Sequence, residues 1–273
     1  FRQDPENAFL KEVDSLALSN TQLNVNQACT RQFARGKTPR FLSKSRQKRR
    51  YTTNCVNGNI YIEQGSYTDS FIRLPKLEKV RIRLHRNIPD GGVLKHVTVK
   101  ETAGGKFFAC LTFEVMQEEV PVRTEFEKTE AFDYSMPNLA VSASGQNDVS
   151  AEDIRWYRRM EAKIAREMRR LSHMEYGSEN YRKQKHKVGA LHEKAANRRK
   201  DYLHRLSYTV ARNFDAVGVE DINLRAMAQA LNFGKSVNDN GFGMFRNFLA
   251  YKLHAQGKIL VKVDRFFPSS QMC

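Results

Sequence analysis

The stretch EAFDYSMPNLAVSASG, residues 130–145, decides the fold of the second half of the chain. Its apolar pattern predicts two short strands joined by a turn, with Asp133 at the end of the first strand. The run FDAVGVEDIN at 214–223 predicts another strand, with Glu220 near its end. The segment 241–258 predicts an amphipathic helix that ends at Gly257, and ILVKVDRFF at 259–267 predicts a buried strand. Strands that alternate with helices in this way indicate an α/β unit.

A long helical hairpin is expected between these strands, over residues 151–213. Two apolar stripes at helical spacing predict the buried sides of its helices, and EYGSEN at 175–180 predicts the turn between them. The first stripe contains Trp156, Met160, Ile164, Met168 and Leu171, and the second contains Val188, Leu191, Ala195, Tyr202, Leu206 and Val210. Between residues 155 and 212 the chain carries 17 Lys or Arg against 6 Asp or Glu. A basic outer surface on such a hairpin suits nucleic acid.

The first half of the chain has a different pattern. Residues 6–34 predict a helix, whereas residues 57–120 alternate apolar with polar side chains in short runs and so predict antiparallel strands in a barrel or a sandwich. In KVRIRLHR at 79–86, one face of the strand is expected to carry Val80, Ile82 and Leu84. The opposite face is expected to carry Arg81, Arg83 and His85. The chain as a whole therefore falls in the α+β class.

The formal charge of the chain is +16, which favours nucleic acid as a partner. A dense basic segment interleaved with Phe41 and Tyr51 can neutralise phosphates and stack on bases, although a solvated basic loop has the same composition. Its candidate nucleic-acid-binding residues are Arg35, Lys37, Arg40, Lys44, Arg46, Lys48, Arg49 and Arg50, to which Arg81 and Arg83 are added. We find no apolar run long enough to span a membrane, and the four scattered cysteines indicate a reducing, intracellular compartment.

Two acidic residues at strand ends are the candidate site. If the strands that carry Asp133 and Glu220 are neighbours, the two carboxylates meet, and they repel each other unless a cation lies between them. Magnesium takes oxygen ligands and can activate water for phosphodiester hydrolysis. The pattern therefore makes the chain a candidate metal-dependent nuclease, although an acidic residue at a strand end is more often a turn or helix cap.

Five segments in order resemble one family, the TnpB or OrfB-type transposases of insertion sequences, which are relatives of the type V CRISPR effectors. They are PRFLSKSR at 39–46, IRLPKLEKVRIRLHR at 72–86, AFDYSMPNLAVSASG at 131–145, VGVEDINLRAM at 217–227 and FRNFLAYKLHAQGKILVKVDRFFPSSQMC at 245–273. The resemblance implies an RNA-guided DNA endonuclease with guide RNA and target DNA as partners, located in the cytoplasm with the nucleoid. It implies the end of a helical recognition region at 1–35, a small β-barrel at 36–127, and an RNase H-like RuvC domain at 128–273 into which the hairpin 151–213 is inserted.

The resemblance also assigns site residues. Asp133 and Glu220 are similar to the first two catalytic carboxylates that bind Mg²⁺, and Cys273 is similar to the first ligand of a four-cysteine structural Zn²⁺ site. The remaining zinc ligands and the third carboxylate of the family lie beyond Cys273. We therefore expect a chain truncated at both ends that does not cleave DNA by itself.

One residue departs from the family pattern inside the first carboxylate segment. The family usually has Gly two residues after the catalytic Asp, whereas this chain has Ser135, followed by Met136 and Pro137. Two alternatives stay open: a nuclease-inactive, RNA-guided DNA-binding protein or repressor of the same ancestry, and a general RNA-binding protein without a metal site. The sequence leaves the oligomeric state open.

Overall fold

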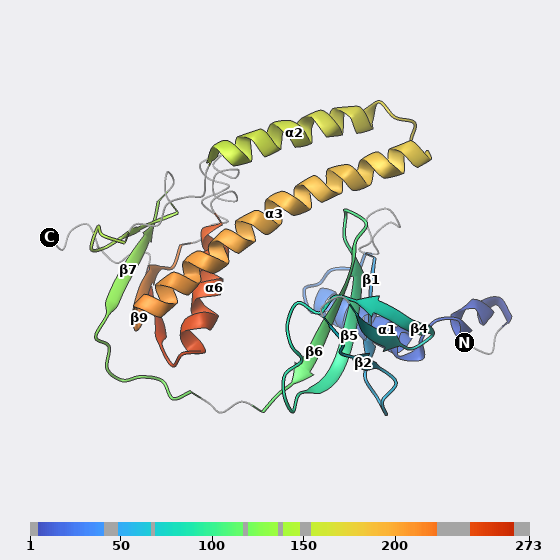
Figure 1. The fold of residues 1–273 in the computed structure, drawn as a ribbon, viewed down its shortest axis with the longest axis horizontal. Coiled ribbons are helices and arrows are strands. Elements are labelled where there is room, and N and C mark those ends of the chain that lie inside the picture. Colours follow the sequence, from blue (N-terminus) through green and yellow to red (C-terminus); the bar gives the residue numbers. More distant parts are fainter. Residues whose placement is uncertain are drawn as a thin grey trace. The chain divides into compact units, whose positions relative to one another are not determined.

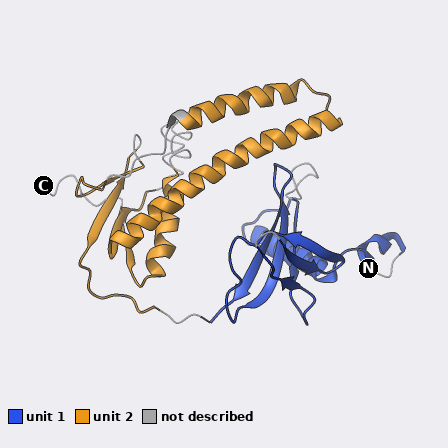
Figure 2. Cartoon of the chain, in the orientation of Figure 1, with its two compact units in different colours: residues 1–117 blue, residues 118–273 orange. Residues whose placement is uncertain are grey.

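The computed structural model describes residues 5–40, 49–66, 69–116, 120–135, 139–147, 154–222 and 241–264. The chain divides into two compact units, residues 1–117 and residues 118–273 (Figure 2). Both units combine helices with small sheets, so the mixed helix-and-strand class predicted from the sequence is confirmed. In the described part of the chain, no helix is long and apolar enough to cross a membrane.

Unit 1 begins with two helical elements where the sequence predicts one helix. The 3₁₀ helix η1 covers Pro5–Lys11 and the α-helix α1 covers Ser15–Phe33. The break lies at Asp14, whose carboxylate caps α1 by accepting a hydrogen bond from the Leu16 amide at 3.2 Å. Asp14 also accepts a hydrogen bond from the buried hydroxyl of Thr53. A cap that is tied to a strand in this way fixes the start of the helix.

The strands of unit 1 form two antiparallel three-stranded sheets, in the orders β1-β5-β6 and β2-β3-β4. The antiparallel strands predicted over 57–120 are present as β2 to β6, and β1 is an additional strand at the end of the basic segment. The bounds are β1 Arg50–Asn54, β2 Tyr61–Glu63, β3 Ser70–Leu74, β4 Leu77–Ile82, β5 Val93–Glu101 and β6 Phe107–Glu114. The sheets are separate and neither closes on itself, so the expected closed barrel is not seen among the described strands.

The two sheets of unit 1 share a small core. Ile72 and Leu74 of β3 are buried together with Val97 of β5 and with Ile60, which directly precedes β2. The pattern predicted for β4 is only partly right, because Val80 is 41% exposed rather than buried. β4 is an edge strand paired only with β3, so its apolar side is incompletely covered.

Unit 2 is built on a four-stranded sheet in the order β10-β9-β7-β8. β10 and β7 pair with the central strand β9 in parallel, and β8 joins β7 as an antiparallel edge. The strands are β7 Thr129–Tyr134, β8 Ala140–Ser142, β9 Ala216–Glu220 and β10 Ile259–Val263. The helices are α2 Ile154–Ser172, α3 Glu179–Asn213 and α6 Phe242–His254 (Figure 1). The strands and the helix predicted from the residue 130–145 stretch and its neighbours are thus confirmed.

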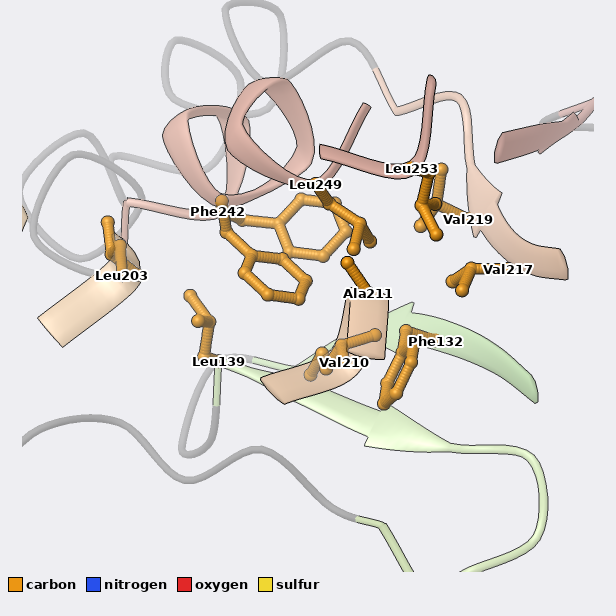
Figure 3. Packing of buried hydrophobic residues seen from close by; sticks show 12 residues of the cluster. Phe132, Leu139, Leu203, Val210, Ala211, Val217, Val219, Phe242, Leu249 and Leu253 are labelled. Atoms are coloured by element: carbon orange, nitrogen blue, oxygen red, sulfur yellow. The ribbon is translucent and has the colours of Figure 1, made fainter. Parts of the chain in front are cut away.

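One face of this sheet carries the core of unit 2. Phe132, Val217 and Val219 meet residues of α3 and α6, all buried (Figure 3). The Phe132 ring makes edge-to-face contacts with Phe245 of α6 and Phe214, with centroids 6.4 Å apart in each pair. Because side chains alternate along a strand, burial of Phe132 and Val219 directs the next residues, Asp133 and Glu220, to the opposite face.

The predicted hairpin is present as α2 and α3, which run side by side in opposite directions (Figure 1). Met160, Ile164 and Val188 are buried in its seam. The buried position predicted for Met168 is wrong, since that side chain is 50% exposed. Its neighbour Glu167 takes the seam position and is buried instead, where a polar network compensates its charge.

A glycine after α6 allows the chain to pass close to a distant segment. Gly257 has a φ of +66°, and a Cβ placed there would lie 2.4 Å from the carbonyl oxygen of Pro121. The same segment is held by the Arg123 amide, which donates to the Gly257 carbonyl at 2.8 Å. Only a residue without a side chain fits this approach.

We expect Gly257→Ala to lower the free energy of unfolding by about 2–4 kcal/mol, because it adds a backbone clash to the cost of a left-handed conformation. Gly177→Ala is the matched control, since Gly177 has a φ of +85° but no atom within 4 Å of its Cβ position. The control should cost about 1 kcal/mol. Urea denaturation of both variants measures the difference, and equal losses would show that the Pro121 contact contributes nothing.

Candidate functional site

Asp133 and Glu220 lie side by side at the carboxyl ends of β7 and β9. The two strands pair in parallel with Phe132 opposite Val219, so the following residue of each strand falls on the same row and face. Hydrogen bonding between their carboxyl groups is one of the causes that raise the pKa of Glu220. The structure therefore brings together the two acidic residues that the sequence singled out at strand ends.

The pair has the electrostatics of a cation site. The pKa of Glu220 is raised to about 7, first by burial, then by the hydrogen bond with Asp133 and by the negative charge of that residue. Two carboxylates this close retain a proton near neutral pH because both cannot ionise without a counter-charge. A divalent cation with oxygen ligands would replace that proton and neutralise both groups.

The sheet next to the pair is lined by small residues. Ala131 and Gly218 precede the two carboxylates on the same face, two residues back on each strand. A Cβ added at Gly218 would lie 3.2 Å from the Cβ of Ala131, so no larger side chain fits between the strands without a shift. Asp133 itself is exposed. No side chain from these two positions covers the carboxylates. A large ligand such as a nucleic-acid backbone can therefore approach them.

The strand end beyond Glu220 is fixed by two contacts. The Asp221 amide donates to the Val263 carbonyl of β10 at 3.0 Å, and Arg246 of α6 donates to the Asp221 carboxylate at 3.0 Å. The other end of β9 is fixed by Asp215, which accepts from Arg123 at 2.8 Å and from the Lys128 amide at 3.3 Å. Both ends of the strand that carries Glu220 are therefore anchored, which holds the carboxylate in place.

Removing the Glu220 carboxyl should change how stability depends on pH. A raised folded-state pKa means that the folded protein loses stability as pH rises from about 4.5 to 7, because the unfolded state releases its proton first. We expect metal-free Glu220→Gln to melt a few degrees higher than the parent chain above pH 7 and at the same temperature below pH 4. Calorimetry across this pH range tests it, and a variant less stable than the parent at pH 8 would contradict the geometry of the pair.

The structure describes only some of the residues that the sequence predicts as metal ligands. In the ranges that are described, no three or more His, Cys, Asp or Glu side chains gather as a metal site, so the carboxylate pair is a two-residue arrangement. Cys273, Met136 and Pro137 lie outside the described residues. Ser135 is described and half-buried directly after β7.

The predicted nucleic-acid-binding residues belong to unit 1, and all of those described are exposed. Arg35, Lys37, Arg40, Arg49, Arg50, Arg81 and Arg83 are exposed, whereas Lys44, Arg46 and Lys48 lie outside the described residues. Two of the exposed arginines already hold acidic partners. Arg81 pairs with Asp69 at 2.7 Å and Arg49 pairs with Glu101 at 3.0 Å.

One basic and aromatic surface of unit 1 was missed from the sequence. On the outer face of β2-β3-β4, Arg73 lies over the Tyr61 ring at 5.7 Å and Lys79 lies over the Phe71 ring at 5.1 Å. The strand register places these side chains on one face, opposite the buried Ile72. The signal was present in the alternation of YIE, SFIRL and LEKVRI, but it becomes visible only when the strands are paired.

Comparison with known proteins identifies two family segments. Residues 112–231 match the OrfB_IS605 family, described as probable transposase, and residues 242–273 match the Cas12f1-like TNB domain. The chain is 30% identical over its whole length to a protein of Streptomyces pristinaespiralis named "Putative RNA-guided DNA endonuclease", of which it covers 65%. It is 28% identical over 98% of its length to "Putative RNA-guided DNA endonuclease InsQ" of Escherichia coli K12, of which it covers 67%.

The chain thus spans about two thirds of the length of these curated relatives. Among solved structures, the Cas12f1–sgRNA–target DNA complex matches with a TM-score of 0.51 at 13% identity, covering 86% of this chain and 58% of that one. At this identity the match supports the fold alone. The family segments and the matches to both relatives agree with the five ordered segments found in the sequence, and residues 112–231 are similar to the OrfB-type transposase family of insertion sequences.

Proposed function

We propose that the chain forms the core of an RNA-guided DNA endonuclease that cleaves DNA by metal-dependent phosphodiester hydrolysis. The observation that carries the proposal is the carboxylate pair, in which Asp133 and Glu220 lie side by side with the pKa of Glu220 raised to about 7. The charge of +16 suits a protein that holds nucleic-acid backbones. The names of both curated relatives support the same activity.

In this proposal Asp133 and Glu220 would hold Mg²⁺, whose carboxylate-bound form activates water and stabilises the leaving oxygen of a phosphodiester. The chain's own residues position the two ligands: β7 and β9 set their spacing, and Ala131 and Gly218 leave the face open. Cys273 would contribute one ligand to a structural Zn²⁺ site. Base pairing between a guide RNA and its target reads the sequence, while the protein holds backbones and shape.

The finer architecture belongs to the same proposal. The sheet β10-β9-β7-β8 with α3 and α6 on one face would be an RNase H-like RuvC domain, and α2 with α3 its helical insertion. The two small sheets of unit 1, over the range 36–127 predicted for the barrel, would grip guide RNA and adjacent DNA. Arg35, Lys37, Arg40, Arg50 and Arg83 would contribute cations to that contact.

One observation favours a second candidate function. Ser135 stands two residues after Asp133, where the family usually has Gly, and its side chain is half-buried beside the site. A side chain there can crowd the scissile strand, which would leave an RNA-guided DNA-binding protein that does not cut. Restoring Ser135→Gly distinguishes the two, because a gain of cleavage would identify a site disabled by that side chain.

The experiment that tests the proposed function compares guides. The protein expressed from the complete reading frame is incubated with Mg²⁺, a guide RNA and labelled DNA that matches or mismatches it. We expect cleavage only of the matched DNA. DNA binding that depends on the guide, without cleavage, would support the second candidate, and binding independent of any guide would overturn both.

A further inference from the structure

One side of α2 carries a row of cations. Arg159, Lys163, Arg166 and Arg170 are spaced by four, three and four residues, which places them on one flank of the helix. All four are exposed, and Arg159, Lys163 and Arg166 form no ion pair within the described part of the chain. The row extends over about 16 Å at the rise of an α-helix.

A second row follows α3. Lys183, Lys187 and Lys194 are spaced by four and seven residues and so also share a flank. All three are exposed. Among the described residues, three of the four cations of the first row, and Lys183 and Lys194 of the second row, make no ion pair with a buried carboxylate, so their charge is available at the surface.

The two rows lie on the same side of the hairpin. Lys187 of α3 reaches the Glu167 carboxylate at 3.0 Å, and Arg170 of α2 reaches the same oxygen at 3.7 Å. Both cations therefore approach one buried carboxylate from a common side. Because the other cations of each row are spaced at the helical repeat, they lie on that side as well. Farther along the same side, Arg198 of α3 lies 4.1 Å from the ring of Trp156 on α2.

The acidic side chain that both rows approach is withdrawn from solvent. Glu167 has a side-chain exposure of 4%. Gln184 donates to its carboxylate at 2.8 Å and to its carbonyl at 2.9 Å, which fixes the register of the two helices. The bond from Gln184, followed by that from Lys187, lowers the pKa of Glu167, so it stays ionised beneath the surface. The charge of Glu167 is offset by Lys187 and Arg170. The other cations of the two rows are not neutralised by it, so the rows stay basic.

We propose that these seven cations form one basic face that binds the paired phosphate backbones of a nucleic-acid duplex. The basic face is Arg159, Lys163, Arg166 and Arg170 of α2 with Lys183, Lys187 and Lys194 of α3. Its two rows follow helices whose axes lie about 8–10 Å apart, and its length corresponds to about five base pairs. The inference deepens the proposed function, on which it rests for its natural partner, a guide–target duplex. It does not depend on cleavage.

A charge-matched pair of variants tests the proposal. The test variant is Arg159→Gln, Lys163→Gln, Arg166→Gln and Lys194→Gln, all on the basic face. It keeps Arg170 and Lys187, because without them the buried Glu167 carboxylate would be left unpaired and the hairpin destabilised. The control variant is Arg158→Gln, Arg169→Gln, Arg182→Gln and Lys185→Gln. These four are equally exposed and lie on the same two helices, but outside the basic face.

Binding is measured by fluorescence anisotropy with an RNA–DNA hybrid of about 20 base pairs, in the absence of Mg²⁺ and between about 50 and 200 mM salt. We expect the test variant to bind at least tenfold more weakly at about 0.1 M salt and its salt slope to fall by about 3. The control variant should keep most of its binding affinity and most of its salt slope. Circular dichroism of each variant verifies that the helices remain folded.

Equal losses in the two variants would overturn the proposal, since they would show that only net charge matters. Unchanged binding in the test variant would overturn it as well. A loss confined to single-stranded RNA, with hybrid binding intact, would identify a single strand as the partner and reject the duplex. If the test variant loses hybrid binding and guide-dependent cleavage is absent in every variant, the result supports the basic face. It then counts only against the proposed function.

Discussion

Asp133→Asn and Glu220→Gln are each expected to lower the rate of guide-dependent DNA cleavage by on the order of a thousandfold. Each change removes one charged oxygen ligand from a site whose cation contributes several kcal/mol to the transition state, and about 1.4 kcal/mol corresponds to a factor of ten. The two variants should have similar effects, and the double variant should be little worse than either, because the pair acts as a unit. Single-turnover cleavage of a matched DNA by the protein from the complete reading frame measures these rates.

The control for this prediction is Asp201→Asn. Asp201 is an exposed carboxylate on α3 paired with Arg205 at 3.1 Å, and its loss should change the rate less than threefold, or about 0.5 kcal/mol. Guide-dependent DNA binding should survive in all variants. Cleavage at an unchanged rate in Asp133→Asn would show that the carboxylate pair is a structural feature rather than the reaction centre.

Phe245→Ala is expected to destabilise unit 2 by about 3–5 kcal/mol, because it removes a large buried ring. The Phe245 ring is fully buried, contacts Phe132 edge-to-face and lies 6.3 Å from the Phe242 ring. Its removal leaves a cavity directly beneath β7, the strand that carries Asp133. We therefore expect cleavage to be lost through unfolding at temperatures where the parent protein is stable.

The single tryptophan, Trp156, lies on α2 of unit 2, so its fluorescence in urea reports the unfolding of that unit. The matched control is Met244→Ala, one residue earlier on α6, where the side chain is 40% exposed. It should cost no more than about 1 kcal/mol. If the two variants unfold at the same urea concentration, the aromatic cluster is not the main source of stability in unit 2.

The site could be predicted from the sequence because it lies on strands with an unambiguous pattern. Burial of Phe132 and Val219 follows from the apolar runs, and burial on alternate positions directs Asp133 and Glu220 to the opposite face. That the two strands are parallel neighbours could not be read from either run. It depends on the pairing of β7 with β9, two strands that are far apart in the sequence and separated by β8, α2 and α3.

Other features depend on pairing and tertiary contact, and the sequence pattern alone did not reveal them. β1 was missed because Arg50 and its neighbours belong to a dense basic segment, and only pairing with β5 makes that segment a strand. The barrel was expected to close, but β4 is paired on one side only, which leaves Val80 exposed. In α2, a polar network with Gln184 places Glu167 in the seam where helical periodicity favoured Met168.

The central claim is that Asp133 and Glu220 together hold a divalent cation, and direct measurement of Mn²⁺ binding tests it without requiring cleavage. Mn²⁺ suits the same oxygen ligands as Mg²⁺ and its free form is detected by electron paramagnetic resonance. We predict that the 273-residue chain binds Mn²⁺, and that the double variant Asp133→Asn, Glu220→Gln loses at least tenfold in affinity while Asp201→Asn keeps it. Equal Mn²⁺ affinity in the parent chain and the double variant would contradict the account.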